Sequence, residues 1–318
     1  MRPRRLLLAA LACLPALPVA AQGFPDRPLT IINPYATGSQ TDAVARALAE
    51  SFQASLGQPV VVTNREGGSG VVGLRALAAS AADGHVLAFS PMVPLTIQPH
   101  LVRNTGLGPD AVAPVCNVTE NLLGVMVRAD APWRTLADLA AEAKRRGLSY
   151  GSPGPNSAPA IGVARLARAA GGGEYVHVPF RSDAASLLEV KAGRVDFAAI
   201  VVASGVPLAR AGEMRLLGTF SLRRHPDFPE VPTAREQGLD AVELSSAGLY
   251  APRGTPEPVL ARLEAACRAA MDSPGLAQVA ARWGVLPEYL GRADFARRIA
   301  ETHESQGRVL RALGVQPE

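Results

Sequence analysis

The sequence predicts an α/β protein of two domains, with a ligand cleft between them and two crossings of the chain. Its 318 residues are enough for two domains that each bury an apolar core. Short apolar strands alternate with amphipathic helices, and this alternation starts again after a strand or crossing at 122–127. The chain returns near 244–251. We therefore expect one domain from 22–121 plus 247–318 and a second domain from 122–246.

The first strand, loop and helix set the pattern. Residues 29–32 predict a buried strand, and a turn-rich loop follows it. Thr41 or Asp42 is placed to cap a helix, because side-chain oxygens accept the unpaired N–H groups of a first helical turn. Apolar residues at every fourth position give that helix one buried face: Val44, Leu48, Phe52 and Leu56. Residues 60–62 predict the next strand, parallel to the first.

The same alternation continues along the chain. Further strands are expected at 86–89, 122–127, 148–150, 175–178, 195–202 and 216–220, and further helices at 72–80, 136–146, 160–170, 184–192, 256–271 and 294–313.

The N-terminus predicts a secretory signal peptide over 1–21. Three arginines precede an apolar run at 6–17, and small residues follow before a cut after Ala21. An uncleaved anchor and a lipoprotein modified at Cys13 are alternatives. The run is short for a bilayer, however, and the residues before Cys13 fit a lipobox poorly. We expect a periplasmic protein.

The net charge, the cysteines and the histidines limit which partners and cofactors are expected. Loss of the signal segment lowers the net charge from +4 to +1, which gives no electrostatic basis for binding nucleic acid. Export permits a disulfide between Cys116 and Cys267, but their spacing does not imply one. The five histidines are not at metal-ligand spacing, and no CxxC or HExxH occurs, so we expect no metal and no cofactor.

Two loops, at 35–42 and 151–157, share one composition. Each follows a strand, is rich in Gly, Ser and Thr, lacks Lys and Arg, and leads into a helix. A helix N-terminus offers unpaired N–H groups and a partial positive charge, so such a loop suits an anion. We expect ligand contacts from Tyr35, Ala36, Thr37, Gly38, Ser39, Thr41, Asp42, Gly151, Ser152, Gly154, Asn156 and Ser157, with Ser90, Met92, Phe180 and Arg181 in the wall.

Two other chemistries are poorly supported. Gly68, Gly70 and Gly73 match GxGxxG, but no acidic residue follows at the spacing that a dinucleotide site needs. Ser152 is a conceivable nucleophile, yet no GxSxG turn surrounds it and no base is implied nearby. His177 lies in an apolar strand, where a structural histidine is the commoner case.

An ordered set of stretches across the whole mature chain resembles the tripartite tricarboxylate transporter substrate-binding proteins, also called the Bug family. Three of the stretches are Phe24-Pro25-Asp26-Arg27-Pro28, Ala82-Asp83-Gly84-His85 and Val178-Pro179-Phe180-Arg181; the others lie at 34–42, 56–65, 151–157, 192–196, 229–233 and 251–256. The resemblance implies a type II periplasmic-binding fold that closes on its ligand. It also implies that the two loops contact a carboxylate of that ligand.

The departures from the family pattern concern the same loops. Ser39 stands where the family commonly has a second glycine, and Pro155-Asn156 replaces an Asn followed by Gly. Ala160 and Ile200 stand where a His and an acidic residue are frequent. Loss of the acid argues against an amino acid as the ligand.

We therefore expect a monomeric binding protein, not an enzyme, that captures a small organic carboxylate. The resemblance implies a membrane permease pair or a sensor protein as its partner. A periplasmic serine hydrolase and a ligand-sensing regulatory domain are the alternatives.

Overall fold

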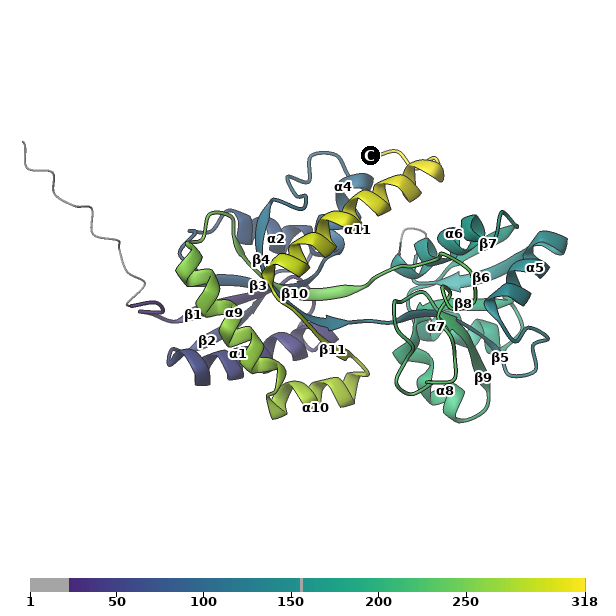
Figure 1. Cartoon of the computed structure of the whole chain (residues 1–318), viewed down its shortest axis with the longest axis horizontal. Coiled ribbons are helices and arrows are strands. Elements are labelled where there is room, and N and C mark those ends of the chain that lie inside the picture. The colour runs from purple at the N-terminus through teal and green to yellow at the C-terminus, as the bar shows by residue number, and fades with distance from the viewer. Residues whose placement is uncertain (1–22, 155–156, 318) are drawn as a thin grey trace, which may run out of the picture.

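The computed structural model describes residues 23–154 and 157–317, and its strands form two sheets. The strands are β1 (Leu29–Asn33), β2 (Val60–Asn64), β3 (Val86–Pro91), β4 (Val112–Glu120), β5 (Leu123–Arg128), β6 (Leu148–Ser152), β7 (Tyr175–Pro179), β8 (Phe197–Val201), β9 (Met214–Thr219), β10 (Ser246–Pro252) and β11 (Leu286–Leu290). One sheet has the order β11-β4-β10-β3-β1-β2 and the other β7-β6-β8-β5-β9. Figure 1 shows the sheets in two bodies, which β4, β5 and β10 join.

Helices pack on both faces of each sheet. They are α1 (Gln40–Leu56), α2 (Val71–Ala78), α3 (Val93–Thr96), α4 (Gln98–Leu101), α5 (Leu136–Arg146), α6 (Ala158–Ala169), α7 (Asp183–Lys191), α8 (Val206–Arg210), α9 (Glu257–Met271), α10 (Pro274–Trp283) and α11 (Arg292–Ala312), with 3-10 turns η1 (Gly68–Gly70) and η2 (Val202–Gly205).

Successive side chains of a strand point to opposite faces of the sheet, so each sheet packs against two separate cores. In β1, Ile31 packs in the cluster that includes α1 and α9, whereas Ile32 packs in the cluster with α2 and α11. In β8, Phe197 faces α5 and α6, whereas Ala198 faces α7. Each sheet is thus buried on both faces, as expected for an α/β protein.

The predicted α/β class and the parallel pairing of β1 with β2 are confirmed. Strands β4 and β11, helix α10 and the short helices α3, α4 and α8 were not predicted from the sequence. Pro114 and Asn117 interrupt the apolar pattern of β4, and β11 contains Pro287 and Glu288. The division of the chain into domains at 121 and 246 stays a prediction.

The carboxyl edges of the two sheets both flank the crossings. Strands β1, β2 and β3 are parallel, and β10 is antiparallel to both β3 and β4, so β1 to β4 end at one edge. In the other sheet, β6, β7 and β8 are parallel, and Val201 at the end of β8 pairs with Leu123 at the start of β5. The Asn121 N–H donates to the Ser245 carbonyl at 2.8 Å, which ties the outgoing chain to the returning chain.

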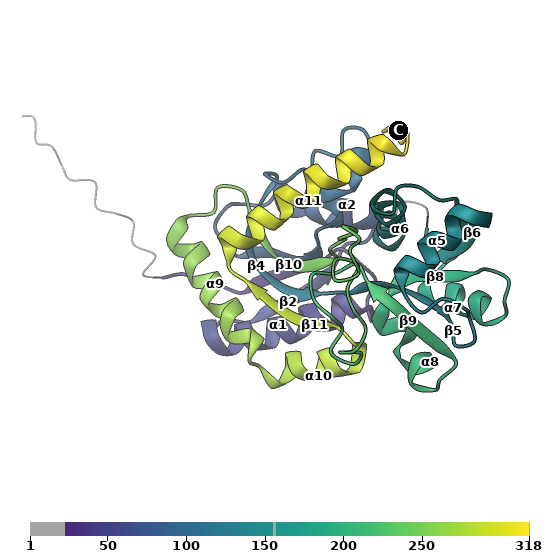
Figure 2. The same ribbon diagram turned by 45° about the vertical axis from the view of Figure 1, so that its right-hand side comes forward.

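Helices α6 and α11 make a second connection between the two bodies. Ile161 of α6 is buried in a cluster with Val309 and Leu310 of α11. Arg165 of α6 donates from Nη1 to Ser305 Oγ of α11 at 2.8 Å. Figure 2 shows α6 beside the C-terminal half of α11.

A disulfide joins Cys116 of β4 to Cys267 of α9, a pairing that the sequence had left open. Both residues are fully buried in the first core. The bond holds a C-terminal helix to the strand that leads into the crossing. Disulfides persist in oxidising compartments, which accords with export.

Replacing both cysteines, as Cys116→Ala with Cys267→Ala, is expected to lower the free energy of unfolding by about 2–5 kcal/mol. The cross-link spans 151 residues of chain, so its loss frees a large loop in the unfolded state. Urea unfolding of the two proteins measures the difference. Equal unfolding midpoints and slopes would show that the bond does not stabilise the fold.

Candidate functional site

The first loop connects β1 to α1 and presents the start of that helix. The N-cap is Ser39, whose Oγ accepts the Asp42 N–H at 3.2 Å; the predicted caps, Thr41 and Asp42, lie inside the first turn instead. The Ser39 hydroxyl also lies 3.0 Å from that of Thr41. Gly38 has a φ of +79°, a conformation that glycine adopts without strain. Ala36, Thr37 and Gly38 are exposed, so the loop is open to a ligand.

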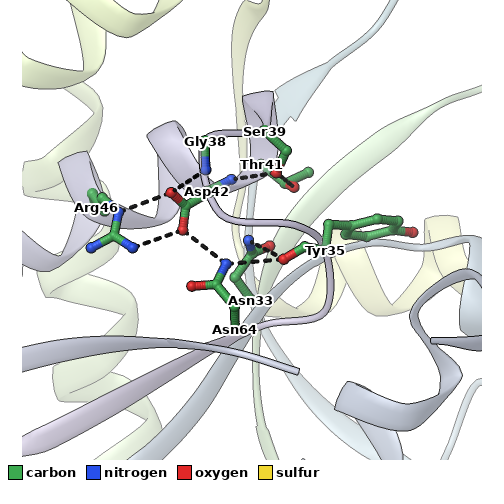
Figure 3. Close-up of polar contacts among 8 residues, drawn as sticks. All are labelled: Asn33, Tyr35, Gly38, Ser39, Thr41, Asp42, Arg46 and Asn64. Carbon is green, nitrogen blue, oxygen red and sulfur yellow. Dashed lines mark hydrogen bonds and ion pairs between the residues drawn. The ribbon is translucent and has the colours of Figure 1, made fainter. Parts of the chain in front are cut away.

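The buried carboxylate of Asp42 holds this loop in shape through hydrogen bonds (Figure 3). One carboxylate oxygen accepts the Gly38 N–H at 3.0 Å and Arg46 Nε at 2.9 Å, and the other accepts Arg46 Nη2 at 3.1 Å and Asn64 Nδ2 at 2.9 Å. Burial by itself raises the pKa of Asp42, but bonds from Arg46, Gly38 and Asn64 outweigh it and lower the pKa to about 2. With 3% exposure and both oxygens occupied, Asp42 shapes the loop from inside.

Tyr35 fixes the other end of the loop. Its carbonyl accepts Nδ2 of Asn33 at 3.1 Å and Nδ2 of Asn64 at 2.9 Å, and its hydroxyl donates to the Ser69 carbonyl at 3.2 Å. Burial raises the pKa of Tyr35 to about 12, so the phenol stays neutral. Neither Asn64 nor Arg46 was predicted from the sequence. The four-residue spacing of Asp42 and Arg46 on the helix could have indicated their ion pair, whereas Asn64 of β2 meets Asp42 only in the fold.

The second loop connects β6 to α6 and repeats this design. Ser157 is the N-cap, and its Oγ accepts the Ala160 N–H at 3.4 Å and donates to the Gly154 carbonyl at 2.8 Å. The Ser152 hydroxyl donates to the same carbonyl at 3.0 Å. Asn156, also predicted to contact the ligand, lies outside the described residues. Both loops therefore place a serine-capped helix N-terminus at a carboxyl edge beside the crossing.

Ser152 does have a potential base beside it, contrary to the sequence prediction. His177 Nε2 lies 2.8 Å from Ser152 Oγ, across the parallel pair β6 and β7. Ser152 is fully buried, and burial lowers the pKa of His177, so the imidazole is neutral near pH 7. The contact escaped the sequence analysis because it depends on strand register.

The predicted wall residues occupy different environments. Ser90 and Met92 are buried, at 0% and 2% exposure, and Met92 belongs to the core cluster around α2. Phe180 is half-buried, and Arg181 is exposed. Gly151 has no room for a side chain, because a Cβ would lie 2.9 Å from the Phe180 ring. That glycine lets Phe180 pack directly beneath the second loop.

A cavity of about 580 Å³ lies elsewhere, between α11, Arg165 and the returning segment at 240–244. Its arginines are each matched by an acid: Arg165 by Glu243, Arg235 by Asp240, Arg297 by Asp294, Arg298 by Glu288, and Arg308 by Glu304. The negative charges of these acids offset those of the arginines, so little net attraction is left for an added anion. The two loops are therefore the better site for an anion.

Comparison with known proteins identifies the family. The model of the tripartite tricarboxylate transporter family receptor matches residues 44–315. This chain belongs to that family. It is thus a solute-binding protein of a periplasmic receptor family and not an enzyme.

Solved structures of the family share its fold. A TctC solute-binding protein from Polaromonas, without ligand, is 25% identical, with a TM-score of 0.84 over 91% of this chain and 99% of that one. MatC from Rhodopseudomonas palustris, with bound malate, is 28% identical, with a TM-score of 0.69 over 90% of this chain and 100% of that one. Rpa4515 from R. palustris, with adipate, is 26% identical, with a TM-score of 0.73 over 93% of this chain and 100% of that one.

Two features are absent from the described parts of the chain. In residues 23–154 and 157–317, no helix has the length and hydropathy needed to cross a membrane. The same residues contain no cluster of three His, Cys, Asp or Glu side chains suited to a metal.

Asp42→Asn is expected to lower the free energy of unfolding at neutral pH by about 1–3 kcal/mol, the usual worth of hydrogen bonds to a charged group. The folded pKa of about 2 lies below the ordinary 3.8, so the carboxylate stabilises the fold above about pH 4. This stabilisation is lost as the pH falls toward 2.

Urea unfolding at about pH 7 and about pH 3 measures this effect. The difference in free energy of unfolding between wild type and Asp42→Asn should be smaller at the lower pH. Glu50→Gln, at an exposed position of the same helix, is the control and should change stability little. A difference that is equal at both pH values would contradict the role given to the Asp42 charge.

Proposed function

We propose that this chain captures a small organic carboxylate, preferably a dicarboxylate, between the start of α1 and the start of α6. One observation carries the proposal: a serine-capped helix N-terminus stands at the carboxyl edge of each sheet, and both edges flank the crossings. Ligands of α/β proteins bind outside the carboxyl ends of strands. Two such helix ends suit a ligand with a carboxylate at each end.

The electrostatics of the first loop support an anion. Asp42 is the acidic residue in the first turn of α1, and Arg46 pairs with both of its oxygens. Its negative charge is therefore compensated and does not oppose a ligand carboxylate. Unpaired N–H groups of the first helical turn remain to donate to such a ligand.

Malate and adipate, which two relatives hold, are both small dicarboxylates, and this supports the ligand class for this chain. The proposed contacts are the loop at 35–41 together with Ser152, Gly154 and Ser157. Phe180 and Arg181 follow β7 at the same edge, and exposed Arg181 is proposed to meet the second carboxylate.

The proposed physiological role is capture in the periplasm, after cleavage behind Ala21, for delivery to a tripartite-type permease or to a sensor. Binding of the ligand would shift the protein from an open to a closed form, because the ligand contacts both loops only in the closed form.

A thermal-shift screen of residues 22–318, unfolded and refolded to remove any carried ligand, tests the ligand class. Di- and tricarboxylates, aromatic carboxylates and amino acids form the panel, with malate and adipate included. A ligand at about 100 times its Kd should add about 2.7 kcal/mol of stability. A panel in which no carboxylate stabilises the protein would remove the proposal.

Thr37→Trp tests the place of binding. Thr37 is exposed in the first loop, so a bulky side chain there should weaken the best carboxylate at least tenfold, about 1.4 kcal/mol, without unfolding the protein. Ala54→Trp, at an exposed position near the other end of α1, is the matched control. Calorimetry measures both. Equal affinities of the two variants would place the ligand elsewhere.

A further inference from the structure

The Ser152 hydroxyl lies at the centre of the polar contacts that shape the second loop. Its Oγ lies 3.0 Å from the Gly154 carbonyl oxygen, 3.4 Å from Ser157 Oγ and 2.8 Å from His177 Nε2. The Ser157 hydroxyl and N–H both donate to the same Gly154 carbonyl, at 2.8 and 3.3 Å. These contacts join the end of β6, the loop and the cap of α6.

The hydroxyl of Ser152 has one proton for these acceptors. If that proton goes to the Gly154 carbonyl, His177 must donate its Nε2–H to Ser152 Oγ. If His177 instead accepts at Nε2, the Gly154 carbonyl loses one of its donors. The tautomer of the imidazole therefore decides how many donors hold the Gly154 carbonyl.

The imidazole is itself held in place. His177 lies on β7 opposite Tyr150 of β6, and the two rings are 4.9 Å apart. Tyr150 in turn stacks on Phe197 of β8 at 5.3 Å. A side chain fixed by three neighbouring strands can fix a hydroxyl that lies in a loop.

We propose that His177 is a positioning residue for the ligand, which acts through Ser152 to hold the Gly154 carbonyl and the Ser157 cap at the start of α6. This rests on the proposed function, since those groups form one half of the proposed site. It assigns the Ser–His pair a role in binding rather than in nucleophilic catalysis. His177 does not itself touch the ligand.

Two substitutions separate the hydrogen bond from the ring. His177→Phe keeps a ring against Tyr150 and removes the nitrogen, whereas His177→Gln keeps a nitrogen at the same distance along the side chain and removes the ring. We expect His177→Phe to weaken adipate binding about tenfold, and His177→Gln to stay within about threefold of wild type. Tyr175→Phe is the control, because the buried Tyr175 hydroxyl has no hydrogen-bond partner among the described residues.

Calorimetry with adipate measures the affinities. Amide NMR of the ligand-free proteins reports on the conformation at Gly154 and Ser157. The Gly154 and Ser157 amide signals should move in His177→Phe and stay in His177→Gln. These signals test the positioning role even if adipate does not bind, a result that would count against the proposed ligand class alone. Thermal melting confirms that each variant is folded. Should His177→Phe fail to fold, Ser152→Ala removes the same bond from the other side and should move the same signals.

Three results would overturn the proposal. If His177→Phe kept its affinity for adipate and His177→Gln lost it, the imidazole ring would matter only for packing. Unchanged Gly154 and Ser157 signals in His177→Phe would mean that the bond does not hold the loop. Labelling of Ser152 in the native protein by a fluorophosphonate would mean that the pair is a nucleophile and its base.

Discussion

The buried carboxylate of Glu243 ties the two bodies together, because it accepts hydrogen bonds both from Arg165 of α6 and from Gln306 of α11. Glu243 is buried where the chain returns to the first sheet, and burial raises its pKa to about 7 against the opposing effects of Arg165 and Gln306. Arg165 Nε donates to it at 2.7 Å from α6, and Gln306 donates from α11. Removing one partner of a buried pair leaves an uncompensated charge. The structure thus links both bodies at one carboxylate, and α6, which starts at the second loop, is held by it.

Polar groups that shape the two loops are satisfied from within, and this leaves the helix ends for a ligand. In the first loop a buried carboxylate is neutralised by Arg46 and holds the Gly38 N–H; in the second, two serines share the Gly154 carbonyl. Different residues thus support the same feature at both helices, a serine-capped N-terminus that presents unpaired N–H groups. A ligand at the proposed site would therefore need little rearrangement of the hydrogen bonds around these helix ends.

Local patterns in the sequence were enough to predict the α/β class, most strands and helices, and both loops. Apolar runs and the four-residue spacing of α1 depend on near neighbours in the chain, so they can be read directly. Much of what escaped prediction depends on distant residues. The Cys116–Cys267 bond joins positions 151 residues apart, and the His177–Ser152 contact follows from the register of β6 and β7. The cap at Ser39 was missed at short range, and there the Asp42 carboxylate is occupied by Arg46, one helical turn further on, and by Asn64 of β2.

The central claim is that one carboxylate ligand is held between the starts of α1 and α6. A crystal structure with the carboxylate that stabilises the protein most tests it directly. The account predicts ligand oxygens within hydrogen-bond distance of N–H or hydroxyl groups in both loops, near Thr37 to Thr41 and near Ser157. A ligand in the arginine-lined cavity beside α11, or one that contacts a single loop in a closed protein, would contradict it.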